Sequence, residues 1–534
     1  MARALNAKNP ALGEQSGGQP EESCAFPAAT YALELTDPAL GESRAQPKQA
    51  WGAFAAATYG LAIIVSLSVW FLAIRAPLWL DETGSYWCIA EGLKKIWPRS
   101  VELNSFPAYY YVLWLTSALF GSSELALRIP SVLAMLGATY LFYRCARELF
   151  ELDAALIACL VFILDARIAF AAIDARPYAF ALLVTNLAIL VFLRWWKTKE
   201  DVYAPVVGLA SAAVFYFHYL FGCLALAFLV CYPRKERGRD GNFRWPLVAA
   251  TASCALGLLP LAPRLWILGQ TRNAHVFAHR PEFIDLLEAL FRGATPFVFV
   301  GVILIAASVR QLSKPSLEDL RRLRMCLALA LVPMLTLYGL TVTTPIHIFV
   351  SRYEAVAVPG IALCWAWVFS RIRSRRLRIL CCAALVAVSA YMSYTSPNAR
   401  SHGYTWKYAL EFANKNAAYD NAPLVICSDL PEADFQPLPT VAPENSVLFS
   451  PLGYYKIQAS VIPLPRALNE QAQIAGEDFL SSHHERFLVL AHKPSRPTIE
   501  WFKEKTSANS AARVLAVFDD ISVVEFAPRN SASN

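Results

Sequence analysis

Residues 51–74 form an apolar stretch of 24 residues without a single charged side chain. About 20 apolar residues in a helix cross the hydrocarbon core of a bilayer, so this stretch is long enough to span a membrane with some tilt. The composition agrees, because 56% of the 534 residues are hydrophobic, only 17% are charged, and the mean hydropathy is +0.38. Such values lie well outside those of soluble globular proteins. The sequence therefore predicts a polytopic membrane protein whose first span also acts as an uncleaved export signal.

Ten further segments are apolar and poor in charge, as transmembrane helices are. They are residues 125–146, 152–167, 177–195, 203–217, 219–232, 246–268, 295–311, 323–343, 353–371 and 378–394. Between them stand basic clusters, which the positive-inside rule assigns to the cytoplasm; they begin at Arg144, Arg194, Arg234, Lys314 and Arg371. All five clusters lie on the same side of the membrane only if the short aromatic segment Phe106–Phe120 does not cross it. We therefore expect eleven spans, with the N-terminus inside, the C-terminus outside, and a large outer loop over residues 76–124 that contains surface-lying helices.

The two ends of the chain differ in composition from the apolar middle. Residues 1–50 are rich in Pro, Gly, Ala, Glu and Gln and lack periodicity, which predicts a disordered cytoplasmic tail. Residues 395–534 have the composition of a soluble domain. Helical patterns and short apolar runs alternate there, at residues 406–414, 424–427, 461–463, 487–491, 499–505 and 514–526. They predict a small α/β domain outside the membrane, of unknown topology.

Charge and cysteine content narrow the classes of function. The net charge of +7 comes from short basic clusters between apolar segments, which favours cytoplasmic loops over a nucleic-acid-binding surface. Most of the 12 cysteines fall in apolar segments, where cysteine behaves as a small buried hydrophobe. No Cys-x-x-Cys or His/Cys spacing is present. We expect no nucleic-acid partner, no disulfide framework and no metal site.

Two adjacent carboxylates, Asp81 and Glu82, follow the first apolar stretch at the expected membrane edge. A carboxylate that is poorly solvated there could accept a proton in catalysis. Aromatic residues such as Trp79 and Trp87 are interleaved with charged ones nearby, which is typical of short helices that lie in a membrane interface. The alternative is that both acids are solvated loop residues.

Several other polar residues are expected at the outer ends of the helices. They are Arg128, Asp165, Arg167, Asp174, Arg176, His218, His275, His279, His347 and Arg352. Ionisable groups at membrane depth are costly and usually face a cavity and a partner. Arginine offers a fork of donors that matches phosphate. For Arg176 and Arg352 the alternative is an interfacial anchor that snorkels to headgroups, and for His218 and His347 it is polar packing at a helix end.

Five motifs, in this order, resemble those of the GT-C membrane glycosyltransferases. They are Leu80-Asp81-Glu82, Phe106-Pro107-Ala108-Tyr109-Tyr110, the segment from Phe120 to Ser131, Ala175-Arg176-Pro177-Tyr178, and Arg352-Tyr353. The most similar branch contains the dolichyl-phosphate-mannose protein mannosyltransferases and the bacterial lipid A aminoarabinose transferase. The resemblance covers roughly residues 55–370. It implies a GT-C fold and inverting transfer of a sugar from a polyprenyl phosphate carrier to a hydroxyl acceptor on the outer side of the membrane.

The resemblance also implies roles for individual residues. Asp81 matches the catalytic acid of the first loop and Glu82 the second acid of that pair, whereas Arg128, Arg176 and Arg352 match arginines near the donor cavity. Other candidate substrate-binding residues are Asp174, Tyr178, His218 and Tyr353. Asp81 would deprotonate the acceptor while arginines stabilise the leaving phosphate, so no metal or other cofactor is expected. The sequence departs from the family at Asn104-Ser105-Phe106-Pro107, which argues against the metal site of the aminoarabinose branch.

Two other functions stay open from the sequence. A lipid-sugar flippase or transporter would share the many spans and buried arginines, although paired repeats would be more typical of it. A membrane scaffold could act through its C-terminal domain. For the enzyme, the expected partners are the polyprenyl-phosphate-linked sugar, membrane lipids, and a glycan, lipid or protein acceptor. The expected location is a bacterial inner membrane, with the active site on the periplasmic face.

Overall fold

The computed structural model describes residues 46–232, 245–270, 280–396, 405–418, 420–439 and 442–529. The predicted N-terminal tail lies outside these residues, except for its last five positions. The basic cluster that begins at Arg234 and the histidines His275 and His279 also lie outside them. Residues 53–534 form one compact unit, and every contact discussed below lies within it.

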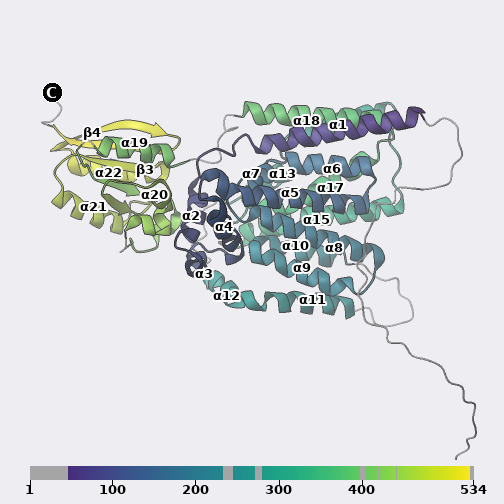
Figure 1. Ribbon diagram of the computed structural model, residues 1–534, viewed down its shortest axis with the longest axis horizontal. Coiled ribbons are helices and arrows are strands. Elements are labelled where there is room, and N and C mark those ends of the chain that lie inside the picture. The colour runs from purple at the N-terminus through teal and green to yellow at the C-terminus, as the bar shows by residue number, and fades with distance from the viewer. Residues whose placement is uncertain are drawn as a thin grey trace, which may run out of the picture. The chain divides into compact units, whose positions relative to one another are not determined.

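The described residues before residue 397 are mainly helical (Figure 1). Its helices are α1 (Gln46–Trp70), α2 (Leu80–Ala90), α3 (Leu93–Glu102), α4 (Pro107–Phe120), α5 (Glu124–Leu149), α6 (Leu152–Leu164), α7 (Ala166–Ala172), α8 (Tyr178–Thr198), α9 (Tyr203–Phe217), α10 (Leu224–Val230), α11 (Trp245–Leu258), α12 (Ala262–Gln270), α13 (Phe283–Leu290), α14 (Thr295–Ser308), α15 (Leu317–Thr343), α16 (Ser351–Glu354), α17 (Val358–Ser370) and α18 (Arg375–Thr395).

The described residues contain six helical segments that are long and apolar enough to cross a membrane. They are Glu124–Leu149, Tyr178–Thr198, Trp245–Gln270, Leu317–Thr343, Ser351–Ser370 and Arg375–Thr395. The pairs α6–α7 and α13–α14 are bent by 68° and 67°, and the number becomes eight if each pair is one span. Shorter apolar helices cover 57–70, 203–217 and 219–230. The chain is therefore a multi-pass membrane protein. All eleven segments predicted as spans contain helices, but whether all eleven cross the membrane stays a prediction.

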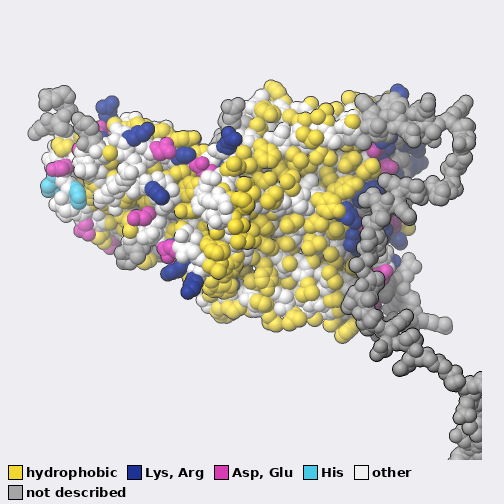
Figure 2. All heavy atoms as spheres, in the orientation of Figure 1, with side chains coloured by type: hydrophobic (Ala, Val, Ile, Leu, Met, Phe, Trp, Pro, Cys, Tyr) yellow, Lys and Arg dark blue, Asp and Glu magenta, His cyan; other side chains and the backbone are white. Residues whose placement is uncertain are grey.

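Hydrophobic side chains dominate the surface of the membrane helices on the face shown in Figure 2. Large ones such as Leu133, Trp266 and Phe297 are more than half exposed, as lipid-facing residues are. Between the helices, small residues permit close packing. A Cβ at Gly208 of α9 would lie 2.1 Å from the carbonyl oxygen of Ala250 on α11, so only glycine lets these two helices approach this closely.

The segment 76–124, predicted as an outer loop, folds into α2, α3 and α4. Helix α4 begins with Pro107, whose fixed backbone angle suits the first helical position, and ends at Gly121, whose φ of 80° suits glycine. At 14 residues it is too short for a comfortable span, and it is not among the candidate spans of the described residues. The predicted helices are thus present, while the side of the membrane on which they lie stays a prediction.

Residues after 404 form a mixed α/β domain, as predicted, which we call the C-terminal domain. Its elements are α19 (Lys407–Ala417), β1 (Leu424–Cys427), α20 (Ser450–Tyr455), β2 (Val461–Leu464), α21 (Glu470–Ser482), β3 (Phe487–His492), α22 (Arg496–Thr506), β4 (Ser510–Phe518) and β5 (Ile521–Pro528). The strand order is β2-β1-β3-β5-β4; β1 pairs in parallel with β2 and β3, whereas β5 is antiparallel to β3 and β4. The run predicted at 514–526 is a hairpin, since it turns at Asp519, where φ is 51°.

The two faces of this sheet are covered by different parts of the chain. Side chains alternate along a strand, so neighbouring residues of β1 face opposite ways. Val425 packs with Phe479 of α21 and Phe502 of α22, whereas Leu424 belongs to an apolar cluster with Leu410 of α19 and Trp87 of α2. The sheet therefore contributes to one hydrophobic core with the outer-loop helices.

Hydrogen bonds fix the C-terminal domain against α2. The backbone N–H of Leu78 donates to the Tyr455 hydroxyl at 2.7 Å. The hydroxyls of Thr83 and Ser450 lie 3.0 Å apart, and the indole of Trp87 donates to the carbonyl of Asn445 at 2.9 Å. Residues some 370 positions apart in the sequence thus hold the helix that carries Asp81 and Glu82.

Candidate active site

Asp81 and Glu82 lie in the first turn of α2. Free backbone N–H groups and the helix dipole favour negative charge at this end of a helix. The Trp79 backbone N–H donates to Glu82 at 3.2 Å, which caps the helix. Successive residues of a helix point about 100° apart. The two carboxylates therefore face different surroundings, and we describe them separately.

Glu82 is fully buried in an ion pair with Arg128 of α5. The Arg128 side chain donates to both carboxylate oxygens, at 2.8 Å and 2.5 Å, and neither side chain is exposed to solvent. Glu82 also accepts from the backbone N–H of Ala175 at 2.8 Å. Arg128 donates in addition to the carbonyls of residues 74, 76 and 77, at 2.5–3.1 Å. This pair joins α2, α5 and the segment before α8, and neither partner lines the cavity described below.

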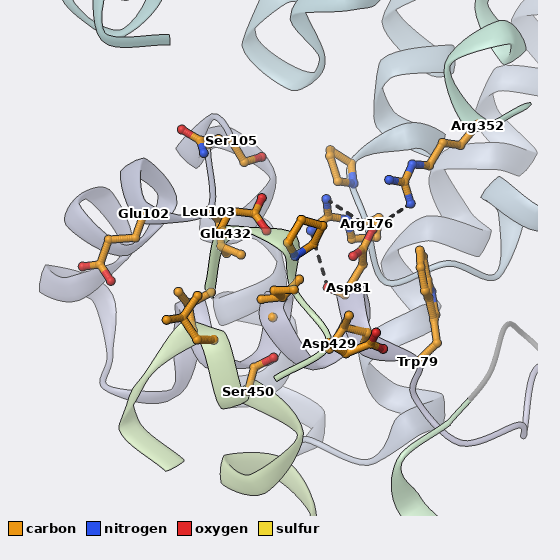
Figure 3. A pocket seen from close by; sticks show the side chains of 18 of the residues that line it. Trp79, Asp81, Glu102, Leu103, Ser105, Arg176, Arg352, Asp429, Glu432 and Ser450 are labelled. Atoms are coloured by element: carbon orange, nitrogen blue, oxygen red, sulfur yellow. Dashed lines mark hydrogen bonds and ion pairs between the residues drawn. The ribbon is translucent and has the colours of Figure 1, made fainter. Parts of the chain in front are cut away.

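Asp81 faces two arginines, Arg352 of α16 and Arg176 of the segment before α8, as Figure 3 shows. Its Oδ2 lies 2.9 Å from Nη1 of Arg352 and 3.9 Å from Nη2 of Arg176. Arg176 also donates to the Asp81 carbonyl at 3.4 Å. The guanidinium of Arg352 lies 5.7 Å from the centre of the Trp79 ring, close enough for a cation–π interaction. A carboxylate between two fixed positive charges can receive a proton beside a site that attracts an anion.

A cavity of about 310 Å³ surrounds these groups. Three parts of the chain line it. The outer loop contributes Trp79, Asp81, Asn104 and Ser105; the membrane helices and their ends contribute Arg176, Tyr178, His218, Arg352 and Tyr353; the C-terminal domain contributes Asp429, Glu432, Ser450, Arg466 and His492. The volume lies at the lower end of the roughly 300–1,000 Å³ that small-molecule sites occupy. The cavity is therefore sized for small reacting groups at the junction of the membrane part and the C-terminal domain.

Aromatic rings form the side of the cavity next to Arg352. The His218 ring lies 5.2 Å from that of Tyr178 and 5.1 Å from that of Tyr353, between centroids. His218 is 8% exposed and caps the end of α9. Asp174 does not line the cavity; it is fully buried, and its carboxylate accepts from the Trp79 indole at 3.1 Å.

Five of the lining residues have a buried polar atom without a hydrogen-bond partner among the described residues. These atoms are Nε of Arg176, Nδ1 of His218, Oδ2 of Asp429, Oε2 of Glu432 and Nε of Arg466. Buried polar groups are nearly always paired, and each exception needs an explanation. Five such atoms around one cavity indicate that a polar ligand completes it.

The structure brings together six of the nine residues predicted from the sequence: Asp81, Arg176, Tyr178, His218, Arg352 and Tyr353. Glu82, Arg128 and Asp174 are buried behind the cavity and do not line it. His347 is not a lining residue either, and the pair of Asp165 and Arg167 belongs to a separate buried network with Glu354.

Sequence reasoning missed the residues that the C-terminal domain contributes. Asp429, Arg466 and His492 lie at or just after the carboxyl ends of β1, β2 and β3. Polar residues directly after apolar runs are a recognisable signal if the runs are parallel strands, because ligands bind at that edge of a parallel sheet. The pairing of such short runs could not be read from the sequence, so this signal was lost.

No group of three or more His, Cys, Asp or Glu side chains that could hold a metal ion occurs among the described residues. His275 and His279 lie outside them. The absence of a metal in the reaction therefore stays a prediction.

Comparisons with known proteins point in the same direction as the resemblance in the sequence. Residues 104–266 match the family model of dolichyl-phosphate-mannose-protein mannosyltransferase. The structure resembles that of ArnT from Cupriavidus metallidurans bound to undecaprenyl phosphate, with a TM-score of 0.52, 12% identity, and coverage of 89% of this chain and 98% of that one. It also matches the archaeal oligosaccharyltransferase AglB from Archaeoglobus fulgidus, solved with an inhibitory peptide and a dolichol-phosphate, with a TM-score of 0.43, 12% identity, and coverage of 88% and 70%. No curated protein matches the chain.

Proposed function

We propose that this chain is a membrane glycosyltransferase of the GT-C type that moves a sugar from a polyprenyl-phosphate carrier to a hydroxyl acceptor on the outer face of the membrane. The transfer inverts the anomeric carbon. The membrane is a bacterial inner membrane and the site faces the periplasm. The similar structure of ArnT was solved with undecaprenyl phosphate, which supports a lipid of that class as the donor here.

The observation that carries this proposal is the position of Asp81. Its carboxylate lies in the cavity between Arg352 at 2.9 Å and Arg176 at 3.9 Å. The reaction needs a proton acceptor next to positive charge, because an acceptor hydroxyl loses a proton while a phosphate leaves with negative charge. Asp81 and the two arginines supply both within one small site.

The proposed step is a single displacement. The acceptor oxygen forms a bond to the anomeric carbon, and the bond from that carbon to the phosphate oxygen breaks. The acceptor proton passes to the Asp81 carboxylate, and the electron pair of the broken bond leaves with the phosphate. Arg176 and Arg352 stabilise this charge, which spreads over a group that their planar forks fit. Holding both substrates in one cavity supplies further rate enhancement.

Glu82, Arg128 and Asp174 act as positioning residues in this proposal. The Glu82–Arg128 pair holds the first turn of α2 to α5, and Asp174 orients the Trp79 indole. Each reaches the reaction only through a residue that lines the cavity. The test of the whole proposal is transfer by the purified protein from a synthetic polyprenyl-phosphate sugar; a wild-type protein that neither transfers nor hydrolyses any such donor would contradict it.

Replacing Arg352 or Arg176 by Met should weaken donor binding. A hydrogen bond between charged groups is worth about 1.5–3 kcal/mol, so each variant should raise the dissociation constant of the donor about 10- to 100-fold. Binding of a polyprenyl phosphate to the purified variants measures this. Arg321→Met changes an exposed arginine of α15 outside the cavity and is the matched control. Donor affinity equal to that of the wild type in both variants would return these arginines to the role of interfacial anchors.

Excess EDTA should leave the transfer rate unchanged within about twofold. The two cavity arginines provide the positive charge that a leaving phosphate requires, and Asp81 and Glu82 point apart and cannot clasp one ion. The measurement is transfer from a synthetic donor before and after chelation. Activity that disappears and returns with added Mg²⁺, Mn²⁺ or Zn²⁺ would show that a metal takes part.

A further inference from the structure

The C-terminal sheet turns one particular edge toward the cavity. Strands β2, β1 and β3 run parallel, and a cavity-lining residue stands at the carboxyl end of each. Asp429 is the second residue after β1, Arg466 the second after β2, and His492 the last of β3. The carboxyl edge of parallel strands is the usual place for a ligand in a sheet of this kind. We call this edge, together with the 3₁₀ turn Pro431–Asp434, the carboxyl-edge wall.

The carboxyl-edge wall carries polar groups that are poorly solvated. Nδ1 of His492 lies 3.1 Å from Oδ1 of Asp429, and both residues are buried. Oε2 of Glu432 and Nε of Arg466 are buried without a hydrogen-bond partner among the described residues. Burial raises the pKa of Glu432, and the nearby Asp81 adds to this, whereas Arg466 and Arg352 act against it. These groups are set to bond a ligand that brings its own donors and acceptors.

The cavity therefore has two chemically different sides. The membrane helices contribute Arg176 and Arg352, which suit a phosphate. The carboxyl-edge wall contributes one arginine, Arg466, but also the carboxyl groups of Asp429 and Glu432, so it offers a phosphate no excess of positive charge. The donor phosphate thus belongs on the arginine side, and the wall suits a neutral group that carries hydroxyls.

We propose that the carboxyl-edge wall is the acceptor subsite and that it binds the terminal ring of a saccharide through Glu432, Arg466 and the Asp429–His492 pair. This inference rests on the proposed function and names its acceptor class. Planar carboxyl and guanidinium groups can each bond two neighbouring hydroxyls of a sugar. A cavity of about 310 Å³ suits the reacting ends of two saccharides. In the transfer step the attacking hydroxyl of this ring forms the new bond to the anomeric carbon, and its proton goes to Asp81.

The test uses the purified full chain with a synthetic polyprenyl-phosphate sugar and three kinds of acceptor probe: methyl hexopyranosides, a peptide rich in Ser and Thr, and a phosphorylated glucosamine disaccharide. We expect transfer to methyl hexopyranosides. Glu432→Gln should raise the acceptor KM at least tenfold and leave the donor KM within twofold. Glu504→Gln makes the same change on the exposed side of α22 and should alter neither.

The outcomes separate this inference from the proposed function. Hydrolysis of the donor without acceptor, retained in Glu432→Gln, shows that the donor side works by itself. Transfer to the peptide or the phosphorylated probe but not to a hexopyranoside would overturn the saccharide subsite. An unchanged acceptor KM in Glu432→Gln, or equal changes in the acceptor and donor KM values, would also overturn it. The same holds if the wild type hydrolyses the donor but transfers its sugar to no hexopyranoside. A wild type that neither transfers nor hydrolyses would instead contradict the proposed function.

Discussion

Asp81→Asn should reduce sugar transfer by about 10²- to 10⁴-fold, the contribution that a positioned proton acceptor usually makes. Asparagine keeps the shape and can still accept from Arg352, which lies 2.9 Å from Asp81 in the wild type. It cannot take the proton of the acceptor. Because the variant also loses a negative charge between Arg176 and Arg352, the donor phosphate should bind as tightly as before or more tightly.

The measurements are the initial rate of transfer and the dissociation constant of the donor, on the same preparation. Asp478→Asn, on the exposed side of α21, makes the same chemical change away from the cavity and should behave like the wild type. A transfer rate in Asp81→Asn above a tenth of the wild-type rate would rule out Asp81 as the proton acceptor. Loss of donor binding in Asp81→Asn would instead show that Asp81 acts in binding the donor.

Arg128→Met should destabilise the folded protein by about 3–5 kcal/mol, since it leaves the buried Glu82 carboxylate without its charged partner. Both side chains have no exposure to solvent, so water cannot replace the lost bonds. The carbonyls of residues 74, 76 and 77 lose their donor as well. We expect a large drop in the melting temperature of the purified protein in detergent, with little folded protein recovered.

A double-mutant cycle separates the ion pair from simple packing. Glu82→Gln combined with Arg128→Met removes both charges, and the Gln carbonyl can still accept from Ala175. The double variant should melt at a higher temperature than Arg128→Met alone. A double variant at least as unstable as the single one would show that the charge on Glu82 is not the source of the instability.

Much of the membrane part could be predicted from the sequence because its signal is local. A run such as residues 125–146 is apolar over a full span, and it folds as part of α5. The acid at position 81 stood out for a similar reason, since it directly follows the first apolar stretch. That Glu82 has a different environment from Asp81 could not be predicted from the sequence. Its partner Arg128 is 46 residues away, and only the packing of α2 on α5 determines that the two meet.

The C-terminal domain was harder to predict because its elements are short and its contacts are long-range. Strands β1 and β2 have four residues each, too few for periodicity to reveal their pairing. The run at 514–526 is apolar on both sides of a turn without glycine, in which Asp519 adopts the left-handed conformation. Helix α20 has six residues and contacts the outer loop, so its role depends on tertiary structure alone. The part of the cavity that this domain supplies could therefore be identified only in the structure.

The hydrogen bonds between α2 and the C-terminal domain also determine when the cavity can be completed during synthesis of the chain. Leu78 bonds to Tyr455, 377 residues later. Ribosomes add about 5–20 residues per second, so about 20–75 s pass between the synthesis of these two residues. For most of that interval the cavity lacks several of its residues, because Arg352 follows Asp81 by 271 positions and the carboxyl-edge wall comes later still. The cavity of a nascent chain thus stays incomplete until the C-terminal domain has been synthesised and has folded against α2.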